Sequence, residues 1–337
     1  MFTTEMVSHL FDSFDKTEVL VIGDVMLDTY VWGKVDRISP EAPVPIVAVE
    51  KRESRPGGAA NVALNLKSLG AVPVLCSVIG NDTRGNEFID ILQQNNLPVS
   101  GIVQSNNRKT TTKFRIISSN TQLLRIDDET TDELTDSDKA TLKSKIGEIL
   151  DKQSIKIIIF QDYDKGVISE EIIEFTVNLA KSRNIPIAVD PKKRNFLSFK
   201  NVTLFKPNLK EIQDGLNISF DGNDLSKVED AVSMLQEKID AAIIMNTLSE
   251  NGVFIRWKEE KNFKTAHHKA HVRNIADVSG AGDTVISVAS LCLAKGLEPE
   301  DITAVSNLAG GLVCEEVGVV PINKNKLKEE VIKTLTF

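Results

Sequence analysis

Cysteine and the larger aromatic residues are scarce in this chain, which has three cysteines, two tyrosines and two tryptophans among 337 residues. Cys76, Cys292 and Cys314 all lie in apolar runs, and no Cys-x-x-Cys pair occurs. The sequence therefore gives no sign of a dithiol or zinc site, and it predicts buried, reduced thiols in a reducing compartment.

Long apolar runs and a targeting segment are also absent. The uncharged run 302–314 is well short of the ~18 apolar residues that a membrane span needs. Residues 1–16 lack the basic start and apolar centre of a signal peptide. We therefore expect a cytoplasmic protein that has no membrane partner.

The chain also lacks an excess of basic residues. It has 40 Lys and Arg residues and 48 Asp and Glu residues, which gives a net charge of −8. This balance argues against a nucleic-acid partner. The pattern G-x-x-x-x-G-K-[ST] does not occur, which argues against a P-loop nucleotidase. The length allows one large domain or two small ones.

Apolar strand-like runs alternate with helix-like runs along most of the chain. This order predicts an α/β fold with a mostly parallel sheet covered on both faces. Gly70 is placed to end one helix, and Ser169 is placed to cap the start of another. The expected strands are 18–24, 72–80, 155–162, 185–190 and 241–246, and the expected helices are 59–70, 84–96 and 169–184.

Two segments break this alternation. Residues 30–56 contain prolines and alternating apolar positions, and residues 110–127 read as a hairpin with its turn near Ser119 and Asn120. We expect both segments to form a small β lid beside the main sheet. No flexible linker divides the chain, so residues 1–337 are expected to form one domain that carries this lid.

The stretch DVSGAGDT (277–284) runs into an apolar helix-like segment. A strand, a glycine-rich turn and a helix start make an anion site, because the first helical N–H groups have no internal partner. Gly280, Ala281 and Gly282 could hold a phosphoryl group, with Asp283 beside it as a proton acceptor. The alternative is that Asp283 only caps the helix and the glycines only shape the turn.

A second glycine pair, in RPGGAANVALNLKSLG (55–70), precedes another helix. With both stretches in view, the sequence resembles the ribokinase/PfkB family of carbohydrate kinases, through GGAANVALNL and DVSGAGDT in that order. The resemblance spans nearly the whole chain, and it implies a ribokinase-like three-layer fold and ATP as phosphoryl donor.

Further stretches resemble one branch of this family, whose members phosphorylate D-glycero-β-D-manno-heptose 7-phosphate at O1 on the route to ADP-heptose and lipopolysaccharide core. ISPEAPVP (38–45) is the most specific, and DYDKG (162–166) and KPNLKE (206–211) agree with it. Some members of the branch carry an adenylyltransferase with an HxGH motif, which is absent here. We therefore expect a kinase-only form, with a separate adenylyltransferase acting downstream.

The resemblance implies a role for each motif residue. Asp283 would be the catalytic base, and Gly280, Ala281 and Gly282 would form the anion hole. Asp277 would either shape the turn or bind a monovalent cation such as K⁺. The residues implied to contact the sugar are Asp28, Gly57, Gly58 and Asn61, with Asp28 expected at the end of the first strand. Asp24 is expected to serve the turn.

A sugar phosphate also needs cations, and the nucleotide needs its own contacts. The basic candidates are Lys113, Arg115, Lys165, Lys192 and Lys193. Asn208 and Glu211 would lie near the triphosphate, with Glu211 ordering water on Mg²⁺, or they would only start a helix. Thr247, Gly252, Asn307 and Gly311 match the branch near the expected adenine position, although each also suits a turn or a helix.

Lids of this family often pair, so we expect a homodimer through the lid. The nearest alternative is a PfkB kinase of another sugar, such as a fructose phosphate, ribose or a nucleoside. The alternative from a different class is a non-catalytic sugar-binding protein that has kept the fold.

Overall fold

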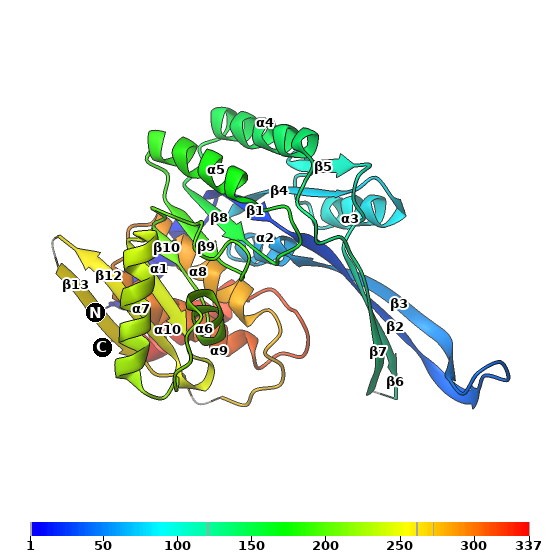
Figure 1. Cartoon of the computed structure of the whole chain (residues 1–337). Helices are drawn as coiled ribbons and strands as arrows, with labels where there is room; N and C mark the ends of the chain where they lie inside the picture. Colours follow the sequence, from blue (N-terminus) through cyan, green and yellow to red (C-terminus); the bar gives the residue numbers. More distant parts are fainter. Residues whose placement is uncertain (1, 120, 261, 272, 337) are drawn as a thin grey trace.

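The computed structural model describes residues 2–119, 121–260, 262–271 and 273–336. These residues build a body around a nine-stranded sheet and a narrow four-stranded sheet that projects from it (Figure 1). We call the second sheet the arm. It consists of β2, β3, β6 and β7.

The sheet of the body has the strand order β13-β12-β11-β10-β9-β8-β1-β4-β5. Neighbouring strands from β11 to β5 are parallel, whereas β12 runs antiparallel to both of its neighbours, β11 and β13. The strands are β1 (Glu18–Gly23), β4 (Val72–Gly80), β5 (Ile102–Ser105), β8 (Ile157–Gln161), β9 (Ile187–Asp190), β10 (Leu204–Phe205), β11 (Ile243–Thr247), β12 (Val253–Glu259) and β13 (Asn262–His268).

Helices cover both faces of this sheet, because its central strands are apolar on both sides. In β1, Val19 and Val21 join one buried cluster, whereas Leu20 and Ile22 join the other. The first cluster takes in α1 (Thr4–Ser13), α2 (Ala59–Ser68), α3 (Thr83–Gln94), α8 (Ala281–Ala294), α9 (Pro299–Val313) and α10 (Lys324–Leu335). The second takes in α4 (Asp136–Lys152), α5 (Glu170–Ser182), α6 (Leu209–Leu216) and α7 (Leu225–Ile239). This arrangement confirms the predicted α/β class.

The arm has the strand order β3-β2-β6-β7. Its strands are β2 (Val25–Ile38), β3 (Pro45–Gly58), β6 (Thr112–Ser118) and β7 (Thr121–Asp128). The segments expected to form the lid therefore lie in one sheet, in which β2 and β6 pair in parallel. Ser119 has a φ of 50° between β6 and β7, and Asn120 lies outside the described residues. The function of the arm as a lid stays a prediction.

Two predicted helix ends have different outcomes. Gly70 follows α2 with a φ of 96°, a backbone conformation that favours glycine and suits a helix end. Ser169 occupies the start of α5 as expected, but its hydroxyl makes no hydrogen bond in the described structure. Ser169 therefore occupies the N-cap position of α5 without capping the helix through its side chain.

Candidate active site

Asp283 lies in the first turn of α8, at the edge of the sheet where the parallel strands end. The residue is only 6% exposed. Burial raises the pKa of its carboxyl to about 6, and the nearby Asp190 adds to the rise, whereas hydrogen bonds from Asn61 and Tyr163 oppose it. Such a carboxyl is ionised at neutral pH and can still take up a proton.

Hydrogen-bond donors from distant parts of the chain converge on this carboxylate. Asn61 in α2 donates to Oδ2 over 2.6 Å. Gln161, at the end of β8, donates to Oδ1 over 3.1 Å, and the Tyr163 hydroxyl donates to the same oxygen over 2.8 Å. Asn61 was expected near the substrate. Sequence reasoning missed Gln161 and Tyr163, although Gln161 ends a predicted parallel strand, where sites commonly form.

The glycine turn before α8 differs in two respects from the anion site that the sequence predicts. The described residues immediately before the turn, 273–276, form a loop rather than a strand. The N–H of Ala281 donates to the carbonyl of Val278 over 3.3 Å, so it is not free for an anion. The N–H groups of Gly280 and Gly282 have no partner among the described residues, so two of the three expected amide donors are available to an anion.

Gly280 and Gly282 differ in backbone conformation and in surroundings. Gly280 has a φ of 79°, which a residue with a side chain would adopt only with strain. A Cβ on Gly282 would lie 3.7 Å from Oδ2 of Asp190 and 3.8 Å from Nζ of Lys206, so this glycine faces the charged side of the site. Lys206 and Asp190 form a buried ion pair of 3.0 Å there, which the sequence did not reveal.

A cavity of about 510 Å³ opens in front of Asp283 and the glycine turn. It runs along the carboxyl ends of β8 to β11, where ligands bind in open parallel sheets. The sequence-predicted residues that line it are Lys192, Asn208, Glu211, Thr247, Gly252, Gly280, Ala281, Gly282, Asp283, Asn307 and Gly311.

Asn208 and Glu211 form a reciprocal cap at the start of α6. The N–H of Asn208 donates to Oε2 of Glu211, and the N–H of Glu211 donates to Oδ1 of Asn208, each over 2.8 Å. Oε1 of Glu211 pairs with Nζ of Lys192. These residues therefore start a helix as expected, and Glu211 also lines the cavity. A role beside the triphosphate stays a prediction.

The residues expected around adenine lie at one end of the cavity, and three of them have structural contacts. Asn307 donates to the carbonyl of Lys269 over 2.9 Å. Gly252 has a φ of 86°, and a Cβ there would collide with the carbonyl of His268. A Cβ on Gly311 would lie 2.8 Å from Nε of Arg273. The two glycines therefore also serve backbone and side-chain packing.

Asp28 is not at the end of the first strand, contrary to the expectation. The strand β1 ends at Gly23, and the N–H of Asp24 donates to the carbonyl of Gln161 over 3.2 Å before the chain enters the arm. Asp28 therefore lies inside β2, where it pairs with Arg115 of β6 over 2.5 Å.

The glycine pair lies at the base of the arm. A Cβ on Gly57 would lie 2.4 Å from Oδ2 of Asp28, so this glycine allows the acid to approach the backbone. Gly58 has a φ of 64° at the start of α2, and a Cβ there would lie 2.4 Å from the carbonyl of Asp24. The pair therefore shapes the entrance of α2, which carries Asn61.

The polar face of the arm carries cations over an aromatic ring. The guanidinium carbons of Arg55 and Arg115 lie 5.2 and 5.3 Å from the centroid of the Tyr30 ring. A Cβ on Gly318 would lie 3.4 Å from Nη1 of Arg55, and the N–H of Gly318 donates to Asp277 over 3.0 Å. The polar face is therefore turned toward the glycine turn.

The basic candidates are not brought together. Arg115 and Lys113 lie in β6, whereas Nζ of Lys165 pairs with Glu129 over 2.7 Å and so already has a counter-charge. Lys192 lines the cavity beside Glu211, and Lys193 is exposed next to it. The structure thus separates an arm group, Lys113 and Arg115, from a cavity group, Lys192.

The family comparison agrees with this geometry. Residues 16–326 match the family described as pfkB family carbohydrate kinase. The chain belongs to the pfkB family of carbohydrate kinases. The predicted family and the predicted ATP-dependent carbohydrate kinase activity are therefore confirmed.

Curated relatives of this kinase include bifunctional protein HldE of Magnetococcus marinus, 37% identical over 335 residues, which are 98% of this chain and 67% of the relative. Bifunctional protein HldE of Aliarcobacter butzleri is 37% identical over 314 residues, which are 93% of this chain and 64% of the relative. The chain thus spans about two thirds of the length of these relatives.

Solved structures resemble the kinase in fold. Phosphofructokinase-2 from Escherichia coli in complex with potassium has a TM-score of 0.76 at 17% identity, over 95% of this chain and 99% of that one. Arabidopsis thaliana ribokinase complexed with ribose and ATP has a TM-score of 0.70 at 16% identity, over 93% and 99%. These likenesses confirm the ribokinase-like fold.

Two further observations complete the description of the kinase. Within the described part of the chain, every helix is too short or too polar to span a bilayer.

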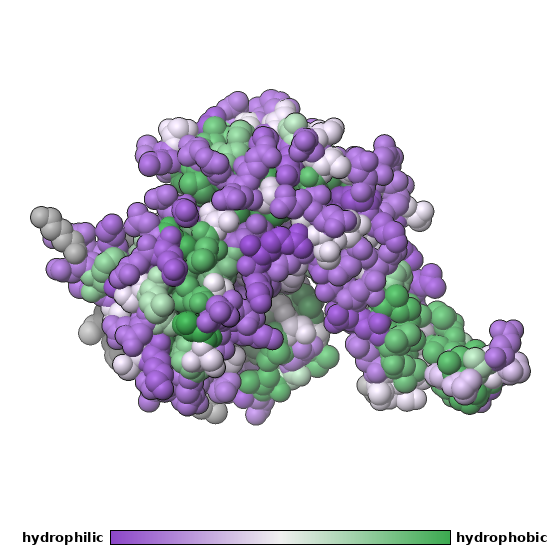
Figure 2. Space-filling view, viewed as in Figure 1, coloured by the Kyte–Doolittle hydropathy of each residue, from purple (hydrophilic) through white to green (hydrophobic). Residues whose placement is uncertain are grey.

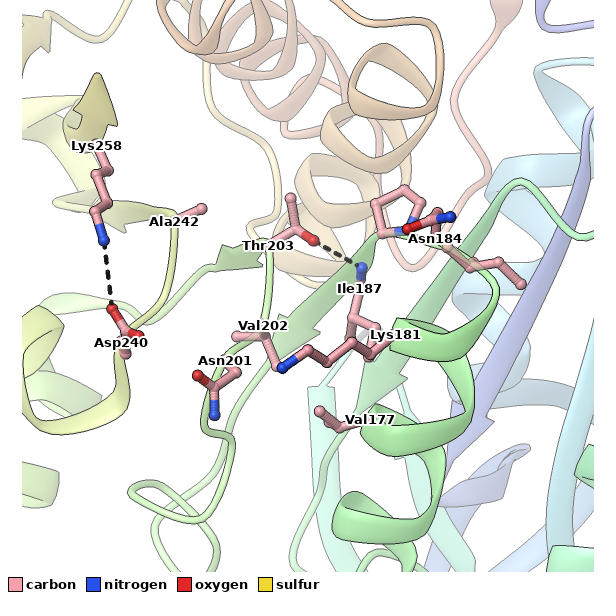
Figure 3. Close-up of a pocket in the computed structure, with 12 residues that line it drawn as sticks. Val177, Lys181, Asn184, Ile187, Asn201, Val202, Thr203, Asp240, Ala242 and Lys258 are labelled. Carbon is pink, nitrogen blue, oxygen red and sulfur yellow. Dashed lines mark hydrogen bonds and ion pairs between the residues drawn. The ribbon is translucent and has the colours of Figure 1, made fainter. Parts of the chain in front are cut away.

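A second hollow of about 530 Å³ lies at the opposite edge of the sheet (Figure 3). It is formed near the amino ends of β9, β10 and β11, where Lys258 faces Asp240 over 3.9 Å. It contains none of the predicted site residues.

Proposed function

We propose that this kinase transfers the γ-phosphoryl group of ATP to O1 of D-glycero-D-manno-heptose 7-phosphate. The product would be the 1,7-bisphosphate, a precursor of ADP-heptose for lipopolysaccharide core. The branch-specific stretch ISPEAPVP and the similarity of 98% of this chain to a protein named HldE support this substrate. Both substrates are phosphorylated metabolites of the cytoplasm, which is where we place the reaction.

The main support for this proposal is the position of the Asp283 carboxylate. Its carboxylate lies at the cavity wall, between the glycine turn of α8 and Asn61 of α2. We assign it as the base that takes the proton from O1 as that oxygen attacks the γ-phosphorus. The free N–H groups of Gly280 and Gly282 would stabilise charge on the phosphoryl oxygens.

We assign the cavity in front of Asp283 to ATP. Thr247, Gly252, Asn307 and Gly311 would border the adenine, and the cavity would direct the triphosphate toward Gly282. Lys192 and Lys206 add positive charge along this path, although each has an acidic partner. Phosphate oxygens can share such cations, because Lys has three donors.

One carboxylate oxygen suits a role for Mg²⁺. Oε2 of Glu211 is used in the cap of α6, whereas among the described residues Oε1 pairs with Lys192 alone, at the cavity. Because Mg²⁺ keeps several waters, Glu211 would hold it through water rather than directly. The ion would neutralise charge on the β- and γ-phosphates.

The hydrogen bonds of Asp277 indicate that it shapes the turn rather than binding a cation. Its Oδ1 accepts the N–H of Ser279 over 2.9 Å, and its Oδ2 accepts the N–H of Gly318 over 3.0 Å. These hydrogen bonds lower the pKa of the Asp277 carboxyl. A dependence on K⁺ stays a prediction, and we do not assign Asp277 as its ligand.

The arm would cover the sugar and hold its 7-phosphate. Its polar face, with Lys113 and Arg115, is turned toward the glycine turn, so both cations are candidates for the phosphate. Asp28 holds Arg115 in place from the neighbouring strand. In this position the Asp28 oxygen that Arg115 does not contact would be the main acceptor for sugar hydroxyls.

We also propose a homodimer formed through the arm. Strand pairing sets Val31, Ile116 and Leu124 side by side on the face opposite the cations. Leu124 is 54% exposed, and Ile126, in the same strand, is 48% exposed. Figure 2 shows green areas on the outer part of the arm. A second copy of the arm would cover them.

Competing substrates test this function directly. ADP release would be measured with D-glycero-D-manno-heptose 7-phosphate, fructose 6-phosphate and ribose at equal concentrations. We expect kcat/KM for the heptose phosphate to exceed the others by at least about 100-fold, because a site built for a substrate discriminates strongly against analogues that leave its polar groups without partners. Equal or faster turnover of fructose 6-phosphate would assign the kinase to another sugar.

A further inference from the structure

The two oxygens of the Asp283 carboxylate have different hydrogen-bonding states. A carboxylate oxygen has two lone pairs for hydrogen bonds. Oδ1 accepts both Gln161 and Tyr163, whereas Oδ2 accepts only Asn61 in the described structure. Oδ1 is therefore saturated, and Oδ2 has one lone pair left.

Tyr163 is held in place by a fixed loop. Its own N–H and that of Lys165 donate to Oδ2 of Asp24 over 2.8 and 3.1 Å, and the N–H of Val167 donates to Oδ1 over 3.0 Å. Asp24 thus anchors the loop after β8, and its expected role in the turn after the first strand stays a prediction. Arg108 also donates to the carbonyl of Lys165 over 2.6 Å. The phenol is therefore presented from a rigid backbone.

The phenol of Tyr163 donates to Asp283 and cannot itself act as the base. Burial, together with the negative charges of Asp283 and Asp190, raises its pKa above the ordinary value for tyrosine. It therefore stays protonated at neutral pH and cannot replace Asp283 as the base. Its ring lines the cavity, with Nζ of Lys192 5.7 Å from the ring centroid.

We propose that Tyr163 is a positioning residue, which saturates Oδ1 of Asp283 and so makes Oδ2 the oxygen that takes up the proton. This inference rests on the proposed role of Asp283 as base. The acceptor hydroxyl would then approach from the side of α2, next to Asn61 and the base of the arm. Its O–H bond breaks as the proton passes to Oδ2, its oxygen bonds the γ-phosphorus, and the bond from that phosphorus to ADP breaks.

Several charged groups face this carboxylate and contribute to its titration. Asp190 at the end of β9 raises the pKa of Asp283, and Lys206, which follows β10, lowers it. Lys192 also faces Asp283 across the cavity. Because these groups stay in place when Tyr163 is changed, a shift caused by Tyr163→Phe reports on the lost hydroxyl.

The kinetic test is the pH profile of Tyr163→Phe. Loss of a donor to the carboxylate should move the acid limb of kcat/KM upward by about one to two pH units. The matched control is Ser290→Ala, which deletes a buried hydroxyl of α8 that makes no hydrogen bond in the described structure, so its profile should equal that of the wild type. A Tyr163→Phe profile that coincides with both would overturn the proposal.

A second readout does not depend on turnover. The chain has only two tyrosines, so protein labelled with ¹³C at tyrosine Cζ gives two signals, and Tyr163→Phe identifies one of them. The Tyr163 signal should titrate with Asp283, near pH 6, and this step should vanish in Asp283→Asn. A wild-type signal that stays constant through this range would refute the contact even if the sugar substrate were wrongly assigned.

Discussion

At the scale of the residue, the charge of Asp283 depends on burial and hydrogen bonding acting in opposite directions. Donors from Asn61 and Tyr163 favour the anion, as does the start of α8. Burial outweighs them, because the pKa rises from 3.8 to about 6. This corresponds to about 3 kcal/mol in favour of the protonated form. The carboxyl is therefore poised close to neutral pH.

The pH dependence of catalysis follows from this raised pKa. Below a pH of about 6 the Asp283 carboxyl is protonated and cannot accept the acceptor's proton, so kcat/KM should fall about tenfold per pH unit there. Above that pH it should reach a plateau. The control is the affinity of Asp283→Asn for the sugar phosphate over the same pH range. This affinity changes with the ionisation of the substrate phosphate but not with that of Asp283, which the variant lacks. A corrected profile without an acid limb would contradict this assignment.

The sequence predicts only some of the site residues, and the reason is geometric. Asp283, Gly280 and Gly282 stand next to one another in the chain, so a short motif reveals them. Gln161 and Tyr163 reach Asp283 from about 120 positions away, which only the assembled sheet brings about. The ion pairs of Arg115 and Lys165 depend on side-chain placement, so the sequence could not show that both cations have acidic partners.

At the scale of the element, the loop after β8 depends on one buried acid. Asp24 accepts the N–H groups of Tyr163, Lys165 and Val167, and it is fully buried. Burial raises the pKa of Asp24, whereas these N–H groups and the charge of Arg108 oppose the rise. The loop that carries Tyr163 is thus fixed at the end of β1.

Removing this acid should destabilise the protein. Asp24→Ala leaves these N–H groups without their acceptor, at about 1–3 kcal/mol for each donor that stays buried. We expect a loss of at least about 3 kcal/mol in the free energy of unfolding, measured with urea. Asp12→Ala is the control, because the Asp12 side chain is 71% exposed, and it should change stability by less than about 0.5 kcal/mol. Equal effects of the two substitutions would exclude this anchoring role.

Helices and body strands follow from the sequence more closely than the arm does. The apolar runs that predict β4 and β8 reflect burial, which each segment shows by itself. The pairing of β2 with β6 joins residues such as Asp28 and Lys113, which are far apart in sequence, so neither segment specifies the other. The same limit explains why Asp28 was assigned to the first strand instead of the arm.

At the scale of the whole molecule, the arm extends away from the body (Figure 1) and exposes apolar side chains, among them Leu124 and Ile126 (Figure 2). A buried Leu side chain contributes about 1.5–3 kcal/mol relative to an exposed one. In a symmetric dimer each such residue would be buried on both subunits, so its contribution to the free energy of association would be doubled. Pairing of two arms is thus the proposed state in solution.

A charge on this face should separate the dimer. Leu124→Glu would bury a carboxylate at the proposed interface, so sedimentation velocity should show a monomer where the wild type sediments as a dimer. Met234→Glu is the control, because Met234 is 44% exposed on α7 of the body and should leave the dimer intact. A monomeric wild type, or a dimeric Leu124→Glu protein, would show that the arm does not form the interface.

The central claim is that Asp283 acts as the base in phosphoryl transfer to the sugar. Its most direct test is phosphorus NMR of the products formed from ATP, Mg²⁺ and heptose 7-phosphate by the wild type and by Asp283→Asn. We predict a new sugar phosphate at C1 with the wild type, and a rate about 10²- to 10⁴-fold lower with Asp283→Asn, which should still bind both substrates. Product formation by Asp283→Asn at the wild-type rate would contradict the account.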